Sequence, residues 1–213
     1  MPRVLYIEVS PRKAVSASSA AAKSFLDGIS EVSGVTVDTL DLWGANLPEF
    51  DGAMIDAKYA RLAGRTLDER EAKAWQRITM IVDRLKAADV LVIATPMWNF
   101  GIPYKLKHWI DLITQPGLTF SFNPASGYAP LLDPKPVVVI LASAGDYRRE
   151  RSRGRPDLAS PYLLEALKFI GLTEVTIVPV APTVGSQLET AAALDNAKSA
   201  LASLVANFKR YAA

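Results

Sequence analysis

The feature that most constrains the fold of this chain is the regular alternation of short β-branched runs with longer segments of helical periodicity. Three of the runs, VLVIA, VVVILA and VTIVPV, are almost continuously apolar, which is typical of parallel strands covered by helices on both faces. The alternation therefore predicts a doubly wound α/β fold around a parallel sheet. The five expected strands are Val4 to Val9, Val35 to Leu42, Val90 to Ala94, Val137 to Ala142 and Val175 to Val180.

Apolar residues recur at helical spacing between these strands. After the third strand, the positions i, i+3, i+4 and i+7 are filled by Leu106, Trp109, Ile110 and Ile113. Pro103 suits the first turn of that helix, and Gly171 suits the residue just past the end of the fourth. The expected helices are Ser18 to Ile29, Leu67 to Ala87, Pro103 to Thr114, Asp157 to Ile170 and Gln187 to Tyr211.

The composition indicates one folded domain over residues 1–213. Half of the 213 residues are hydrophobic and 22% are charged, which is enough to bury a substantial core and unlike a disordered chain. No internal repeat or Gly/Ser linker marks a second domain. Two segments are longer than ordinary connections: Gln115 to Pro136, which contains the alternating pair Phe120 and Phe122, and the Arg-rich Gly145 to Pro156.

Composition also excludes several classes of function. Without cysteine there is no disulfide, no thiolate nucleophile and no Cys-ligated metal site, and a net charge of +2 gives no reason to expect a nucleic-acid partner. No apolar run reaches the length of about 18 residues that a transmembrane helix needs. The N-terminus lacks the pattern of a signal peptide, so we expect a cytoplasmic protein with no membrane insertion.

Serines follow the first expected strand. In a doubly wound sheet, ligands bind beyond the carboxyl ends of the strands where the strand order reverses. Ser16, Ser18 and Ser19 stand there at the start of a helix, where hydroxyls and free N–H groups can hold a phosphate. An ordinary serine N-cap is the alternative. Neither GxGxxG nor GxxxxGK[ST] occurs at this point, which disfavours a dinucleotide-wrapping turn or a P-loop.

The third strand leads into TPMWNFGIP, the most informative stretch of the chain. Pro96 fixes one backbone angle, Gly101 permits unusual ones, and Asn99 tolerates the left-handed region. Such a loop can aim N–H groups at the edge of a planar ring, although a structural turn with core aromatics is the alternative. Apolar walls are offered by Met97, Trp98 and Phe100. The fourth strand ends in ASAGDY, where Ser143 and Gly145 provide a second tight turn.

These three loops, in this order, resemble the FMN-dependent NADH-azoreductase and NAD(P)H:quinone oxidoreductase family of the flavodoxin-like superfamily. The segments that carry the resemblance are VLYIEVSP, the serine loop, VIATPMWNFGIPYKLKHWID, GLTFSF, VVVILASAG and PYLLEALKFIGLTEV. The resemblance implies a flavodoxin-like, doubly wound, five-stranded parallel sheet of order 2-1-3-4-5 with helices on both faces. It also implies an enzyme that binds FMN, takes hydride from NADH or NADPH, and reduces quinones or aromatic azo compounds by two-electron ping-pong transfer. The pocket of that family forms at a homodimer interface.

The resemblance assigns roles to particular residues. The flavin carries the chemistry, so no catalytic side chain and no metal are expected, and backbone N–H groups near Asn99 and Phe100 would stabilise charge on the ring. The FMN phosphate would be held by Ser10, Ser16, Ala17 and Ser18. The isoalloxazine would be cradled by Pro96, Met97, Trp98, Asn99 and Phe100, with its other edge closed by Ser143, Ala144, Gly145 and Asp146. The acceptor pocket would be lined by Phe120, Trp98 and Tyr147, with Phe120 from either subunit.

Two departures from the family pattern concern the acceptor side. Many relatives have a glycine pair after the fourth-strand serine, where this chain has Ala144, Gly145 and Asp146. Some relatives place an aromatic residue over the flavin where this chain has Ala166, which predicts a more open acceptor pocket.

The remaining distinctive residues have competing interpretations. His108 is the only histidine, and because Trp109 and Ile110 should face the core, we expect it toward solvent or an interface in a non-catalytic role. The aromatic and Met residues in Trp43 to Phe50, Met54 and Tyr59 are expected to cover the sheet edge or join a dimer contact. The arginines Arg148, Arg149, Arg151, Arg153 and Arg155 could recognise the 2′-phosphate of NADPH. The alternative is a solvated loop that pairs with Glu150 or Asp157.

Other functions on a similar fold fit the sequence less well. An electron carrier without turnover usually has an acidic docking face, which the charge balance does not suggest. A phosphoacceptor domain needs an Asp after the third strand and a Lys after the fifth, where this chain has Thr95, Pro96, Pro179 and Val180. A hydrolase would lack a Cys or a second His.

Overall fold

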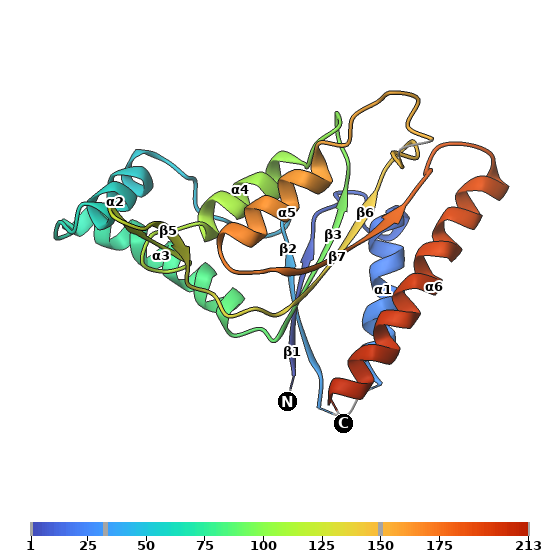
Figure 1. Ribbon diagram of the computed structural model, residues 1–213, viewed down its shortest axis with the longest axis horizontal. Coiled ribbons are helices and arrows are strands. Elements are labelled where there is room, and N and C mark those ends of the chain that lie inside the picture. The colour runs from blue at the N-terminus through green and yellow to red at the C-terminus, as the bar shows by residue number, and fades with distance from the viewer. Residues whose placement is uncertain (1, 32–33, 149–150, 213) are drawn as a thin grey trace.

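Five parallel strands form the centre of the molecule, as a computed structural model of residues 2–31, 34–148 and 151–212 shows (Figure 1). In spatial order the strands are β2 (Thr36–Asp41), β1 (Arg3–Glu8), β3 (Val90–Pro96), β6 (Pro136–Ala142) and β7 (Glu174–Val180). Since β6 and β7 are the fourth and fifth strands of this sheet, the predicted order 2-1-3-4-5 and the flavodoxin-like topology are confirmed.

Helices cover both faces of the sheet, which explains why its central strands are apolar throughout. Val4 faces a cluster that includes Phe25 of α1 and Leu201 of α6, whereas the next residue, Leu5, faces a cluster with Ile78 of α3. Figure 1 shows α1 and α6 on one side of the sheet and the other helices on the opposite side. The helices are α1 (Ala17–Ser30), α2 (Gly52–Leu62), α3 (Glu69–Lys86), α4 (Tyr104–Ile113), α5 (Ala159–Phe169) and α6 (Gln187–Ala212). Within the described ranges, no helix combines the length and apolarity needed to cross a membrane.

The predicted helices are confirmed to within a few residues, with one correction at α4. Pro103 is the N-cap residue of α4, with extended backbone (φ −60°, ψ 146°), and does not lie in its first turn. Gly171 follows the C-cap of α5 with φ 106°, as expected of the residue past a helix end. A proline therefore marks the start of α4, and a glycine marks the end of α5.

One helix, one hairpin and one short 3-10 helix were not predicted. The α2 helix starts at its N-cap Asp51, whose side chain accepts the N–H of Met54, and it packs against α3 with Ala57 and Ala60 buried. The long segment before β6 contains a two-stranded antiparallel hairpin of β4 (Phe120–Asn123) and β5 (Gly127–Pro130). A short 3-10 helix, η1 (Lys13–Val15), precedes α1.

The carboxyl ends of β1, β3 and β6 meet at one edge of the sheet. The N–H of Val9 donates to the Ala94 carbonyl at 3.0 Å, and the N–H of Met97 donates to the Ala142 carbonyl at 2.7 Å. These bonds continue the parallel ladders into the three following loops. The fold therefore places side by side the loops in which the sequence predicts a ligand site.

Candidate active site

The serine loop ends as the N-cap of α1. Ser16 has extended backbone, and its Oγ accepts the N–H of Ser19 at 3.3 Å and lies 3.1 Å from the Oγ of Ser18. Ser10, two residues past the end of β1, accepts the N–H of Arg12 at 3.3 Å. Ser10, Ser16 and Ser18 are buried, and Ser19 is partly buried. The N-cap interpretation of Ser16 is confirmed, and its phosphate role stays a prediction.

A phosphate would find free donors at this loop. The N–H groups of Ala17 and Ser18, the first two of α1, have no acceptor in the described part of the chain. Together with the serine hydroxyls and the positive end of the helix dipole, they form a set of donors, and the first turn of α1 carries no acidic residue of its own. The residues present therefore fit a phosphate monoester.

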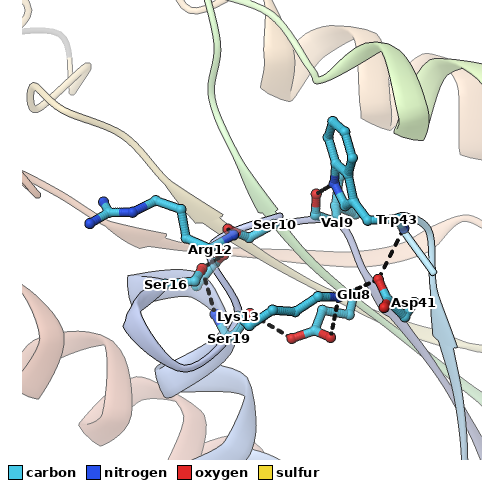
Figure 2. A network of polar contacts seen from close by, with 10 residues as sticks. Glu8, Val9, Ser10, Arg12, Lys13, Ser16, Ser19, Asp41 and Trp43 are labelled. Atoms are coloured by element: carbon cyan, nitrogen blue, oxygen red, sulfur yellow. Dashed lines mark hydrogen bonds and ion pairs between the residues drawn. The ribbon is translucent and has the colours of Figure 1, made fainter.

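A charged network fixes the shape of the serine loop, as Figure 2 shows. Lys13 has φ 49°, and its Nζ forms an ion pair with Asp41 at the end of β2 and a 3.2 Å hydrogen bond with Glu8 at the end of β1. The second oxygen of the Glu8 carboxylate accepts from Ser19 Oγ at 3.0 Å. Burial alone would lower the pKa of Lys13, but the hydrogen bonds to Asp41 and Glu8 outweigh it, so that its pKa is raised. The loop is thus tied to two strands and to α1.

Sequence reasoning did not find this network. The only sequence signal of this network is that Glu8 and Asp41 stand at the carboxyl ends of the first two strands. Lys13 follows Glu8 by a few residues. In the first strand Glu8 looks like a polar residue at a strand end. Only the pairing of β1 with β2 brings the three charges together.

Trp43 links the serine loop to the loop after β3. Its Nε1 donates to the Val9 carbonyl at 2.7 Å (Figure 2), and its ring lies 6.0 Å from Trp98 and 5.6 Å from Tyr104. The expected packing role of Trp43 at this sheet edge is confirmed. The packing also reaches Trp98, which is one of the predicted ring contacts.

The loop after β3 is a tight two-residue turn. Trp98 and Gly101 exchange two backbone hydrogen bonds of 2.9 Å, and Asn99 and Phe100 between them have φ 49° and φ 70°. Two successive positive φ values define a type I′ turn. The left-handed backbone expected at Asn99 is confirmed, whereas the unusual angle expected of Gly101 falls on Phe100 instead.

This turn has two free donors and two exposed aromatic residues. The N–H groups of Asn99 and Phe100 have no acceptor among the described residues. Trp98 and Phe100 are 37% and 41% exposed, so both rings can be covered further by a ligand. Free N–H groups flanked by exposed rings are what the acceptor atoms on the edge of a planar heterocycle require, so the turn fits an isoalloxazine.

The loop after β6 closes the third side. Ser143 donates its N–H to the Val180 carbonyl at 3.1 Å and its Oγ to the Gly145 carbonyl at 2.8 Å. The ring of Tyr147 lies 6.4 Å from that of Phe100, which brings this loop to the turn after β3. A 230 Å³ cavity between the two loops is lined by residues that include Met97, Ser143, Asp146 and Tyr147.

Asp146 has a structural task in this loop. Its buried carboxylate accepts from Arg148 Nε at 2.9 and 3.0 Å and lies 3.6 Å from Arg151 Nη1. The hydrogen bond from Arg148 lowers the pKa of Asp146 below its ordinary value. The charge of Asp146 is therefore kept and is directed at arginines.

The Arg-rich segment differs from the expected ion pairing. Arg149 and Glu150 lie outside the described residues. Asp157 pairs with none of the arginines that the structure describes: its Oδ1 accepts the N–H groups of Ala159 and Ser160, both at 2.9 Å, and thereby caps α5. Among the described residues, this carboxylate therefore serves the helix and not the arginines.

Phe120 lies away from the three loops within this chain. It is 4% exposed in an aromatic cluster with Phe169 of α5 at 5.0 Å and Tyr128 of β5 at 5.8 Å, and Lys58 of α2 approaches its ring. Figure 1 shows the hairpin on the side of the molecule that carries α2 and α3. Its acceptor-pocket role stays a prediction.

Two further residues have defined positions. His108 is half-buried, with Nε2 at 2.9 Å from the Pro48 carbonyl, so it contacts the segment before α2 rather than open solvent. Ala166 packs against the core cluster under α5. Neither residue joins the hydrogen bonds of the three loops.

Comparisons with known proteins agree with this geometry. The family model described as "Flavodoxin-like fold" matches residues 2–205. "FMN-dependent NADH:quinone oxidoreductase 1" of Bradyrhizobium diazoefficiens is 48% identical over 186 residues, covering 87% of this chain and 89% of that protein. A protein named "FMN-dependent NADH:quinone oxidoreductase" from Desulfotalea psychrophila is 43% identical over 199 residues, 93% of each chain.

A solved structure extends the similarity to a flavin complex. The FMN-dependent NADH-azoreductase of Bacillus anthracis, crystallised with FMN, superposes with a TM-score of 0.85 at 27% identity, covering 98% of this chain and 100% of that one. The resemblance carried by the three loops is confirmed. The chain belongs to the flavodoxin-like family of FMN-dependent NADH:quinone oxidoreductases and azoreductases.

Proposed function

We propose that this protein reduces quinones and aromatic azo compounds with electron pairs from NADH, using FMN held by the loops after β1, β3 and β6. The observation that carries the proposal is the type I′ turn, which combines the free N–H groups of Asn99 and Phe100 with two exposed aromatic residues, Trp98 and Phe100. Bound FMN supplies the chemistry, because it accepts hydride and returns electrons in pairs.

The chain binds and orients the cofactor. Ser10, Ser16 and Ser18, with the free N–H groups of Ala17 and Ser18, would hold the phosphate. The walls and edge of the isoalloxazine site would be supplied by Pro96, Met97, Trp98, Asn99, Phe100, Ser143, Ala144, Gly145 and Asp146. The N–H groups of the turn are fixed by reciprocal hydrogen bonds, so they are oriented before any ligand arrives.

Trp98 and Tyr147 would also contact the second substrate. Trp98 is 37% exposed and Tyr147 lies beside Phe100 on the neighbouring loop, so nicotinamide and acceptor would share one position over these rings and bind in turn. Steady-state rates at several fixed acceptor concentrations should therefore give parallel double-reciprocal lines. Intersecting lines would require both substrates to be bound together and would contradict the shared position.

We further propose a homodimer in which Phe120 lines the acceptor pocket of either subunit. The exposed rings of Phe122 and Tyr128, at 48% and 62% exposure, give the hairpin an apolar surface suited to a second copy. Light scattering after size-exclusion chromatography tests the dimer, and a monomer at micromolar concentration would contradict it. A cytoplasmic location, where NADH is regenerated, fits the reaction.

The decisive experiment is the visible spectrum of the purified protein loaded with FMN, recorded anaerobically before and after NADH, and again after a benzoquinone. Flavin bands that bleach with NADH and return with quinone support the reductase. Failure to bind FMN would contradict the central assignment. Binding without bleaching would favour the alternative of an electron carrier, although the relatives are oxidoreductases by name.

A further inference from the structure

Four arginines of the loop after β6 line an open cleft. The cleft has a volume of about 760 Å³ and lies between that loop, the segment after β7 and the first turns of α6. Figure 1 shows the loop and the start of α6 at the same end of the molecule. The described arginines that line the cleft are Arg148, Arg151, Arg153 and Arg155.

Positive charge exceeds negative charge among the described lining residues. Two carboxylates face the four arginines, and both are engaged. Asp146 accepts a hydrogen bond from Arg148 and forms an ion pair with Arg151, and Glu189 accepts from the N–H and the Oγ–H of Ser186 at 2.9 and 2.7 Å. A ligand in the cleft therefore meets guanidinium groups before it meets a free carboxylate.

Arg153 and Arg155 are the two cleft arginines whose charge is not paired with a described carboxylate. Neither forms an ion pair with any carboxylate that the structure describes. Arg155 is nevertheless held in place, because its Nε donates to the Ser152 carbonyl at 3.0 Å and its guanidinium lies 5.3 Å from the centre of the Tyr147 ring. Its Nη atoms thus stay available to a ligand while the group is oriented.

The backbone at Gly145 makes room for this guanidinium. A Cβ at position 145 would lie 2.6 Å from Arg155 Nη2, a distance that real side chains do not tolerate. The glycine of the proposed flavin edge and the arginine of the cleft are therefore in direct contact. Since Ala144, Gly145 and Asp146 line the cleft as well, a molecule over the flavin edge can extend into it.

We propose that this cleft binds a phosphate group of the nicotinamide dinucleotide, and that Arg153 and Arg155 recognise its ribose 2′-phosphate. The inference rests on the proposed function and adds NADPH to NADH as a donor. A 2′-phosphate carries close to two negative charges near neutral pH, and guanidinium forks match its oxygens in geometry and charge. A volume of about 760 Å³ lies in the usual range of small-molecule and cofactor sites.

Binding of adenosine fragments tests the cleft without turnover. Calorimetry on the FMN-loaded protein should show adenosine 2′,5′-bisphosphate binding about tenfold more tightly than adenosine 5′-monophosphate, as one or two charge-assisted hydrogen bonds would give. The Arg153→Ala/Arg155→Ala variant should lose this difference. Arg153→Ala alone, which removes a side chain without an ion-pair partner, should lose part of it even if the double variant folds poorly. Arg77→Ala on the exposed face of α3 is the matched control and should keep the difference. Equal affinity of the wild type for both probes would overturn the proposal.

The rate of flavin bleaching by NADPH and by NADH shows whether the arginines bind the 2′-phosphate or the pyrophosphate of the dinucleotide. In the double variant, kcat/KM for NADPH should fall about tenfold while kcat/KM for NADH stays unchanged. An equal fall for both donors would place the pyrophosphate at these arginines and overturn the 2′-phosphate assignment. A protein that distinguishes the adenosine probes but is reduced by neither donor would contradict the proposed function and leave the cleft assignment standing.

Discussion

The substitution Trp98→Ala measures how much the type I′ turn contributes to FMN binding. A tryptophan side chain can bury about 250 Å², and 37% of Trp98 is exposed. About 90 Å² of Trp98 is thus free to be covered by the isoalloxazine ring of FMN. At about 25 cal/mol per Å², burial of this area contributes about 2 kcal/mol to FMN binding. The dissociation constant of FMN should therefore rise about 30-fold in the variant.

The assay is fluorescence titration of the apoprotein with FMN, with thermal melts of each apoprotein to show that folding is retained. Tyr59→Ala is the matched control, because Tyr59 is a 65% exposed aromatic on α2 outside the three loops. The control should bind FMN as the wild type does. If Trp98→Ala folds and its FMN affinity stays within about threefold of the wild type, well short of the area estimate, the indole is not a wall of the flavin site.

Three further perturbations test the fold and the site. Gly171→Ala should lower the free energy of unfolding by about 3 kcal/mol in urea melts, because φ 106° disfavours a side chain and the new Cβ would overlap the Leu132 carbonyl oxygen; an unchanged midpoint would refute the overlap. Asp41→Asn should weaken stability by at most about 1 kcal/mol at pH 7, since the pair with Lys13 is partly exposed. Burial would raise the pKa of Asp41, but Lys13 lowers it overall. The contribution of Asp41 to stability is therefore complete above the ordinary pKa of Asp and is lost as pH falls through the lowered pKa. If the wild type stayed more stable than the variant in urea melts at pH 2, the direction of this pKa shift would be contradicted. His108→Ala should leave turnover unchanged, because its imidazole contacts a backbone carbonyl outside the three loops; collapsed turnover with intact FMN binding would assign it a catalytic role.

The sheet could be predicted from sequence because its signal is local. Three strands are nearly continuous apolar runs, and Gly171 ends a helix where a left-handed residue is needed. The α2 helix has a weaker signal, since its buried residues are mostly small alanines that give little contrast with its polar face. The β4–β5 hairpin is short, and burial of Phe120 under α5 comes from tertiary packing rather than from strand alternation.

The candidate site divides in the same way. The turn at Asn99 was predictable because few residues tolerate its backbone, and the serine at the N-cap of α1 is a local signal. The position of the second left-handed residue, Phe100, was not predictable, because a bulky residue with positive φ is rare. The Lys13 network depends on β1 pairing with β2, a contact between distant parts of the chain that no local pattern specifies.

The anchored loop between Ser10 and Ser16 has a consequence for the speed of cofactor binding. Ordering a flexible loop normally subtracts from the affinity and slows association. Here Lys13 already joins the loop to the carboxylates of Glu8 and Asp41 on two rigid strands. Association of FMN with the apoprotein should consequently be a single concentration-dependent phase in stopped-flow experiments, with most of the affinity differences among loop variants appearing in the dissociation rate.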